Sequence, residues 1–167
     1  MRWLSYFILA YIALGVQIAL VGFFEVRDSA PNLVLLVVIF LAVNGGREPV
    51  LLGSFILGVM QDLFTLHPLG TWAVTYTLVA MFVLSTQEIV YREHPLTHFS
   101  LALTGGILCG VVLTIHGWIY PLLHGPSTGH GGGIALFTSA IYTAVLAPIV
   151  LGLLQRMKRA FAFRRRL

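Results

Sequence analysis

Asp62 is the one acidic residue inside an apolar run that extends from residue 50 to residue 64. An ionisable group at the depth of a lipid bilayer costs about 2.5–3.5 kcal/mol on insertion scales, so such a residue requires a partner or a function. Three roles fit an isolated carboxylate: a hydrogen-bonded lock or helix cap within the protein, a contact with a partner helix, and transport of a proton or ion. Asp62 is therefore the first candidate for a functional residue.

The residues around Asp62 suit a close helix contact followed by a turn. Gly58 precedes Asp62 by about one helical turn, and Gly53 lies earlier in the same segment. A glycine on the face that carries the carboxylate opens a cleft through which the side chain reaches a neighbouring helix. The sequence Pro68-Leu69-Gly70 then predicts the end of the helix and a tight turn.

The residue types that perform catalysis or bind metals do not form a recognisable set. Glu93, His94 and His98 resemble a metal-binding group, but their order is not His-Glu-x-x-His and Pro95 disturbs the helical face that such a site needs. The serines of the apolar segments lack a nucleophile motif such as Gly-x-Ser-x-Gly. The sequence predicts no enzymatic activity, no metal and no cofactor.

The composition is that of an integral membrane protein. Of the 167 residues 58% are hydrophobic and 10% are charged, with a mean hydropathy of +0.92, whereas about 25% of the residues in a soluble domain are charged. From His94 to Gln155 there is no Asp, Glu, Lys or Arg. We expect an all-α, polytopic fold with a single membrane domain over residues 1–155 and a basic tail over residues 156–167.

Six apolar segments are predicted, and boundaries rich in charge, Gly and Pro separate them. The second and third are short, so they are expected to be tilted or re-entrant if they do not cross fully. The predicted segments are about 3–24, 32–44, 50–65, 71–90, 97–123 and 134–155.

The distribution of Lys and Arg predicts the orientation. If all six segments cross, Arg2, Arg47, Arg92 and the tail share one side, whereas Arg27 lies alone on the other. The positive-inside rule then places both termini in the cytoplasm of a multi-pass inner-membrane protein. The tail is expected to contact anionic lipids, and not nucleic acid, through Arg156, Lys158, Arg159, Arg164, Arg165 and Arg166.

Small residues recur at helical spacing in the last two segments. Gly106 and Gly110 form a GxxxG pair, and Ala140, Ala144 and Gly152 lie on a stripe with a period of four. Such stripes let helices approach closely. They predict helix packing within the protein's own bundle or, as an alternative, a face reserved for a partner helix.

The chain resembles the family of the bacterial rod-shape-determining membrane protein MreD. The resemblance is carried by a short second segment, a glycine-containing third segment that ends in Gly58-x-x-x-Asp62, the turn Pro68-Leu69-Gly70, and a last segment that is followed by an Arg-rich tail. The group Gly58, Asp62, Pro68, Leu69 and Gly70 matches the characteristic stretch of the family, and the remaining segments match as hydrophobic spans.

This resemblance implies a component of the cell-wall elongation complex. The expected partners are an MreC-like single-span periplasmic protein, the MreB filament, and the SEDS glycosyltransferase–transpeptidase pair. The family is also similar in fold to the substrate-binding membrane subunits of energy-coupling-factor transporters. We interpret the protein as a non-catalytic scaffold or regulator of rod shape; the alternative is a small-molecule binding subunit of a vitamin-type transporter.

Overall fold

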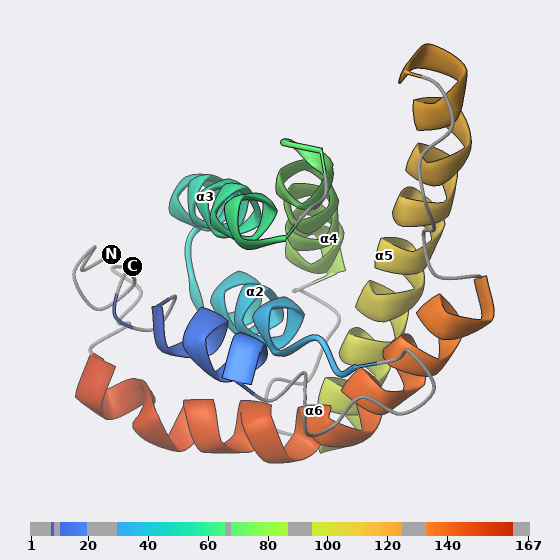
Figure 1. Cartoon of the computed structure of the whole chain (residues 1–167). Coiled ribbons are helices and arrows are strands. Elements are labelled where there is room, and N and C mark those ends of the chain that lie inside the picture. Colours follow the sequence, from blue (N-terminus) through green and yellow to red (C-terminus); the bar gives the residue numbers. More distant parts are fainter. Residues whose placement is uncertain are drawn as a thin grey trace.

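The computed structural model describes residues 8, 11–19, 30–65, 68–86, 95–124 and 133–161. Within these ranges the secondary structure is helical, with short turns between helices (Figure 1). Residues 11–19 are helical and belong to the first predicted segment. The following helices are α2 (Leu33–Asn44), α3 (Arg47–Phe64), α4 (Thr71–Thr86), α5 (Pro95–His124) and α6 (Gly133–Phe161).

Two helix boundaries differ from the sequence prediction. Arg47, Glu48 and Pro49 were expected in a loop, but they form the first turn of α3, and only Gly45 and Gly46 separate α2 from α3. The first turn of a helix tolerates proline, because its N–H groups have no intrahelical partner, and it favours an acidic side chain. Helix α6 likewise extends past residue 155 to Phe161 and includes the first basic residues of the predicted tail.

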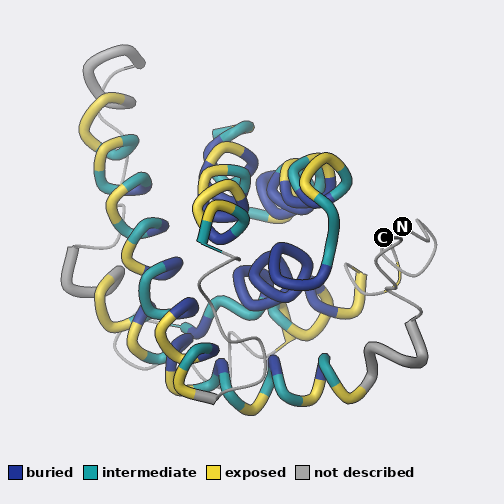
Figure 2. Tube along the Cα trace, turned by 180° about the vertical axis from the view of Figure 1, so that it is seen from behind, coloured by how far each residue is buried: buried dark blue, intermediate teal, exposed yellow. Residues whose placement is uncertain are grey.

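Helix α2 occupies the centre of the structure. Every residue from Val34 to Val43 is buried, with at most 6% of its surface exposed, and α2 contacts α3, α4, α5 and α6. A helix that is apolar on all sides is stable when protein surrounds it. Figure 2 shows α2 as buried along its length. At 12 residues α2 is about 18 Å long. Its short length is compatible with a membrane position because α3, α4, α5 and α6 pack against it.

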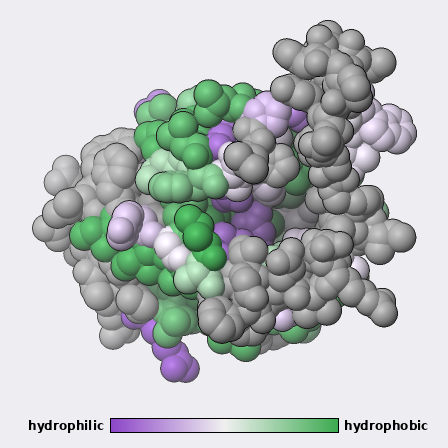
Figure 3. Space-filling view, viewed as in Figure 1, coloured by the Kyte–Doolittle hydropathy of each residue, from purple (hydrophilic) through white to green (hydrophobic). Residues whose placement is uncertain are grey.

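Among the residues that the structure describes, two helices are long and apolar enough to cross a bilayer: residues Leu96–Ile119 within α5 and Phe137–Arg156 within α6. Only 33% of each span is buried, and the exposed side chains are mainly aliphatic and aromatic. Helix α3 also exposes apolar side chains, and the molecular surface over it is largely apolar (Figure 3). On α5 and α6 the exposed apolar residues include Ile107, Val111, Ile115, Ile119, Ile141, Val145, Ile149 and Leu153.

The small residues of α5 and α6 contribute unequally to packing. A Cβ added at Gly106 would lie 2.8 Å from Ala140 Cβ, so the two backbones approach closely here. Ala140 and Ala144 are buried. A Cβ at Gly152 would meet no atom within 4 Å, so this last member of the stripe lies outside the contact. Pro148 lies inside α6.

We predict opposite effects for the same substitution at two of these glycines. Gly106→Ala should lower the free energy of unfolding by about 1–3 kcal/mol, because the new methyl group overlaps Ala140. Gly152→Ala should be neutral or stabilising by up to about 1 kcal/mol, because alanine favours the helix and meets open space. Thermal unfolding of both variants in neutral detergent measures the difference; equal destabilisation would contradict the close contact at Gly106.

Candidate functional site

The side chain of Asp62 lies between α3 and α4. It belongs to the last turn of α3, and only 2% of its surface is exposed. Its carboxylate accepts hydrogen bonds from three backbone N–H groups: Gly70 N–H to Oδ2 at 2.9 Å, Trp72 N–H to Oδ1 at 3.0 Å, and Ala73 N–H to Oδ2 at 3.3 Å. Both carboxylate oxygens are therefore engaged by the beginning of α4.

These bonds complete the N-terminus of α4. The first N–H groups of a helix have no partner within the helix, and they carry partial positive charge. Asp62 binds three of them, and the N–H of Thr71 donates to the carbonyl of Pro68 at 3.3 Å. The N–H of Val74 is bonded to the carbonyl of Gly70 at 3.0 Å within the helix. The first turn of α4 is thus fully hydrogen-bonded, and a negative charge lies at its positive end.

The turn that precedes α4 is the predicted Pro68-Leu69-Gly70 turn. Gly70 has a φ of +100°, a backbone conformation that residues other than glycine rarely adopt. A positive φ at the third residue, together with the bond from Thr71 N–H to Pro68, corresponds to a type II turn. The side chain of Leu69 is 72% exposed at the tip. The turn therefore directs the N–H of Gly70 toward Asp62 and the side chain of Leu69 away from the protein.

Gly58 brings α3 and α4 together one turn before Asp62. A Cβ added at Gly58 would overlap Ala73 Cα and would lie 2.5 Å from the carbonyl oxygen of Trp72. Any larger residue would push α4 away from the carboxylate. Gly53 is also buried in α3. We call Gly58, Asp62 and the first turn of α4 the capping site.

A buried polar network adjoins the capping site, and sequence reasoning missed it. The hydroxyl of Tyr76 lies 2.8 Å from Gln61 Oε1 and 3.0 Å from Asn32 Oδ1, so its single proton is shared between these two acceptors. Asn32 also caps α2 by accepting from the N–H of Leu35, and its own N–H donates to Thr143 Oγ1 in α6. The adjacent polar pair Gln61-Asp62 was a signal in the sequence for such a network. The sequence did not indicate which distant residues bond to this pair.

The first helical segment joins the same region through Gln17. Its Oε1 accepts from the N–H of Leu33, and its Nε2 donates to the carbonyl of Pro31 at 2.9 Å. Ser139 of α6 donates to the carbonyl of Ala30. Side chains from the first segment, α3, α4 and α6 therefore converge at the beginning of α2.

The two histidines of α5 that the structure describes hydrogen-bond to neighbouring helices. His116 Nε2 lies 3.4 Å from Thr71 Oγ1, next to the capping site, and His98 Nε2 lies 2.9 Å from Gln155 Nε2 in α6. Glu93 and His94 fall outside the residues that the structure describes. Among the residues for which positions are given, no three His, Cys, Asp or Glu side chains form a group that could hold a metal ion.

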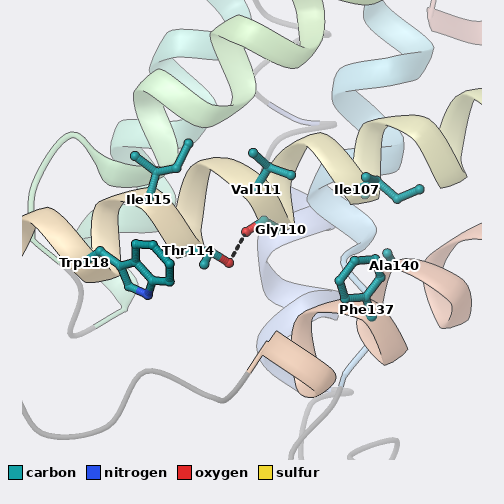
Figure 4. Close-up of a pocket in the computed structure, with 9 residues that line it drawn as sticks. Ile107, Gly110, Val111, Thr114, Ile115, Trp118, Phe137 and Ala140 are labelled. Carbon is teal, nitrogen blue, oxygen red and sulfur yellow. Dashed lines mark hydrogen bonds between the residues drawn. The ribbon is translucent and has the colours of Figure 1, made fainter.

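An apolar cavity of about 300 Å³ lies elsewhere, between α5 and the first turns of α6 (Figure 4). Its described lining includes Trp118 and does not include Asp62, His116 or Tyr142. The cavity is lined by Gly106, Ile107, Gly110, Val111, Thr114, Ile115, Trp118, Phe137 and Ala140.

The predicted lipid-facing tail is described only at its beginning. Arg156 is exposed on α6, and Lys158 and Arg159 belong to the same helix. Arg164, Arg165 and Arg166 lie outside the described residues.

Comparison with protein families confirms the resemblance. The profile of the family described as rod shape-determining protein MreD matches residues 1–157, which includes the whole capping site. The chain belongs to the MreD family. No curated protein and no solved structure matches this MreD family member, so its expected similarity in fold to transporter subunits stays a prediction.

We predict a graded loss of stability for substitutions at Asp62. Asp62→Leu should lower the free energy of unfolding by about 3 kcal/mol or more, because three N–H groups, one buried and two part-buried, lose their acceptor. Asp62→Asn should cost about 1–2 kcal/mol, because one acceptor oxygen remains but the second is replaced by an NH₂ group that faces an N–H donor.

Thermal unfolding in neutral detergent measures this series, with Leu63→Ala as the control. Leu63 lies beside Asp62 in α3 but is 69% exposed, so its truncation should have little effect. An Asp62→Leu variant as stable as the control would show that the cap contributes nothing to the fold.

Proposed function

We propose that this MreD family member is a non-catalytic scaffold or regulator of the cell-wall elongation complex in the bacterial inner membrane. It would control rod shape through contacts between its membrane helices and those of partner proteins. The observation that carries the proposal is the family match over residues 1–157. The capping site supports it, because it gives the buried carboxylate a structural role.

The hydrogen bonds of Asp62 argue against transport. A carboxylate that carries a proton or ion must alternate between charged and neutral forms and between two environments. Asp62 is held by three N–H groups that act only as donors, so protonation would place an O–H against them. Its position favours a structural cap and a fixed arrangement of α3 and α4.

The surface of the described helices suits partners that meet the protein within the bilayer. Helices α3, α4, α5 and α6 expose aliphatic and aromatic side chains, and the connections α2–α3 and α3–α4 are short. As partners we propose an MreC-like single-span periplasmic protein and, beyond it, MreB and the SEDS glycosyltransferase–transpeptidase pair. The apolar faces support this proposal because they offer contact area where extramembrane loops are small.

We also propose that both termini are cytoplasmic, on the basis of the nine-to-one division of Lys and Arg between the two sides. The capping site and the buried polar network would then lie toward the periplasmic side. The basic end of α6 and the residues after it would contact anionic lipids, an attraction worth about 1 kcal/mol per basic residue near the surface.

Complementation of a rod-shaped strain that lacks its own MreD tests this role. The wild type should restore rod shape, Asp62→Leu should leave the cells round, and Asp62→Asn should restore rods at least in part, because Asn keeps one acceptor for the first turn of α4. Leu63→Ala should behave as the wild type. Immunoblots of membranes establish that each variant is present in equal amount.

Two outcomes would overturn the proposal. The first is a wild-type protein that restores no rod shape although it is inserted and abundant. The second is an Asp62→Asn variant that fails as completely as Asp62→Leu at wild-type abundance and stability, which would require an obligatory negative charge and would favour ion transport.

A further inference from the structure

The two ends of α3 expose opposite kinds of side chain. In its first turn the exposed residues are Arg47 and Glu48. At its last turn, and in the turn that leads to α4, the exposed residues are Leu63, Phe64 and Leu69. The bond between Asp62 and the N–H of Gly70 brings the end of α3 and this turn together. We call Leu63, Phe64 and Leu69 the apolar tip.

The sequence around the apolar tip offers no charge to water. Residues 63–70 contain no Asp, Glu, Lys or Arg; Leu66 and His67 within this stretch lie outside the described residues. Exposed apolar side chains that are grouped together mark contact with another protein or with a membrane. The connection between α3 and α4 therefore differs in kind from the connection that leads to Arg47 and Glu48.

The polar groups next to the apolar tip are directed inward. The hydroxyl of Thr65 donates to the carbonyl of Gln61 at 2.9 Å, and the hydroxyl of Thr71 donates to the carbonyl of Pro68 at 2.8 Å. Asp62 accepts from three N–H groups at the beginning of α4. Because the protein itself bonds these groups, they do not require water.

The beginning of α3 shows the reverse arrangement. Its N-cap is Gly46, which makes no side-chain cap hydrogen bond. The first N–H groups of a helix need water when no side chain bonds them. The beginning of α3 is therefore suited to water, whereas the beginning of α4 is suited to a place from which water is absent. This difference in hydrogen bonding is independent of the difference in exposed side chains.

We propose that the apolar tip inserts among the acyl chains of the lipid bilayer, just below the headgroups, while the first turn of α3 lies in water. The depth follows from the turn. The N–H of Gly70 points toward Asp62, so the carbonyl of Leu69 in the same trans peptide group points the opposite way. This carbonyl needs a headgroup or water nearby, which excludes the centre of the bilayer.

The surface of α3 favours lipid as the occupant. The outer face of α3 exposes Leu52 and Phe55, and the largely apolar surface over this helix continues toward the apolar tip (Figure 3). The polar residues Ser54, Gln61 and Asp62 are buried on the opposite face. Exposed aliphatic and aromatic side chains without a polar group among them need only an apolar solvent, and acyl chains supply it.

This inference goes beyond the proposed function, because it concerns the position of the α3–α4 hairpin in the membrane and involves no partner protein. Its test therefore uses purified protein in lipid vesicles. Failure of complementation would count against the scaffold role only, and an apolar tip that lies in water would count against this inference only.

The accessibility of spin labels tests the insertion. In a Cys109→Ala background, Leu63→Cys and Leu69→Cys each carry a nitroxide. Arg47→Cys, at the other end of α3, is the control for water, and Val145→Cys, exposed on the apolar span of α6, is the control for lipid. Molecular oxygen collides with labels among acyl chains, whereas a water-soluble nickel chelate collides with labels in water.

The ratio of oxygen to nickel collisions should be low at residue 47 and highest at residue 145. At residues 63 and 69 it should lie clearly above the value at 47, with 69 below 63 because the turn is nearer the headgroups. Unchanged thermal unfolding of each labelled protein establishes that the label does not disturb the fold.

A substitution in the turn provides a second test. Leu69→Asp, read with the label at residue 63, should increase the nickel collisions toward the rate at residue 47, because a carboxylate among acyl chains is costly and draws the turn to water. Leu69→Met keeps an apolar side chain of similar size and should leave the collisions unchanged.

Three results would overturn the proposal. Nickel collisions at residues 63 and 69 as frequent as at residue 47 would place the apolar tip in water. Rare collisions with both reagents would show that protein covers it, either a second copy or another part of the chain. Collisions at residue 63 that Leu69→Asp leaves unchanged would show that the turn does not depend on apolar surroundings.

Discussion

The hydrogen bonds between the Asp62 carboxylate and the first turn of α4 are the interaction on which the arrangement of α3 and α4 depends. In a bilayer, water is not available to satisfy the free N–H groups of a helix end, and each unsatisfied group costs several kcal/mol. Asp62 binds three such groups at once. A carboxylate without donors and a helix end without acceptors each cost free energy inside a bilayer. When they bond to each other, both groups are satisfied.

The same constraint explains the residues around the carboxylate. Asp62 lies near the negative end of its own helix, where an acidic side chain is disfavoured, and the positive end of α4 offsets this. This favourable interaction requires α4 to lie close to α3, which Gly58 permits. It also requires the N–H of Gly70 to point toward α3, which the positive φ of Gly70 permits. A larger residue at Gly58 would push α3 and α4 apart, and a larger residue at Gly70 would strain the backbone of the turn.

A short central helix poses a similar problem, and it is solved in a similar way. Helix α2 ends within the protein, and its first N–H groups are satisfied by Asn32 and Gln17. Tyr76 connects Asn32 to Gln61, the neighbour of Asp62. The beginnings of α2 and α4 are therefore joined through one polar region, so a disturbance at either helix end is expected to reach the other.

Much of this fold could be predicted from the sequence, because apolar segments and their Gly- and Pro-containing boundaries are local signals. Asp62, Gly58 and the turn at Gly70 were identified because a buried charge and a glycine one turn away are unusual in an apolar helix. The N–H partners of Asp62 were not identified, because backbone groups have no sequence signature. The Tyr76–Asn32 bond was missed since it joins residues 44 positions apart, and Gly152 was misleading because periodicity does not reveal which face meets a neighbour.

Amide hydrogen–deuterium exchange of the α3–α4 region, compared between the wild type and Asp62→Asn in lipid nanodiscs, tests the central claim most directly. If Asp62 caps α4, the N–H groups of Gly70, Trp72 and Ala73 should exchange slowly in the wild type, and those that lose their acceptor oxygen should exchange clearly faster in the variant. The N–H groups farther along α4, which are bonded within the helix, should change little. Unchanged exchange at Gly70, Trp72 and Ala73 in the variant would contradict the account.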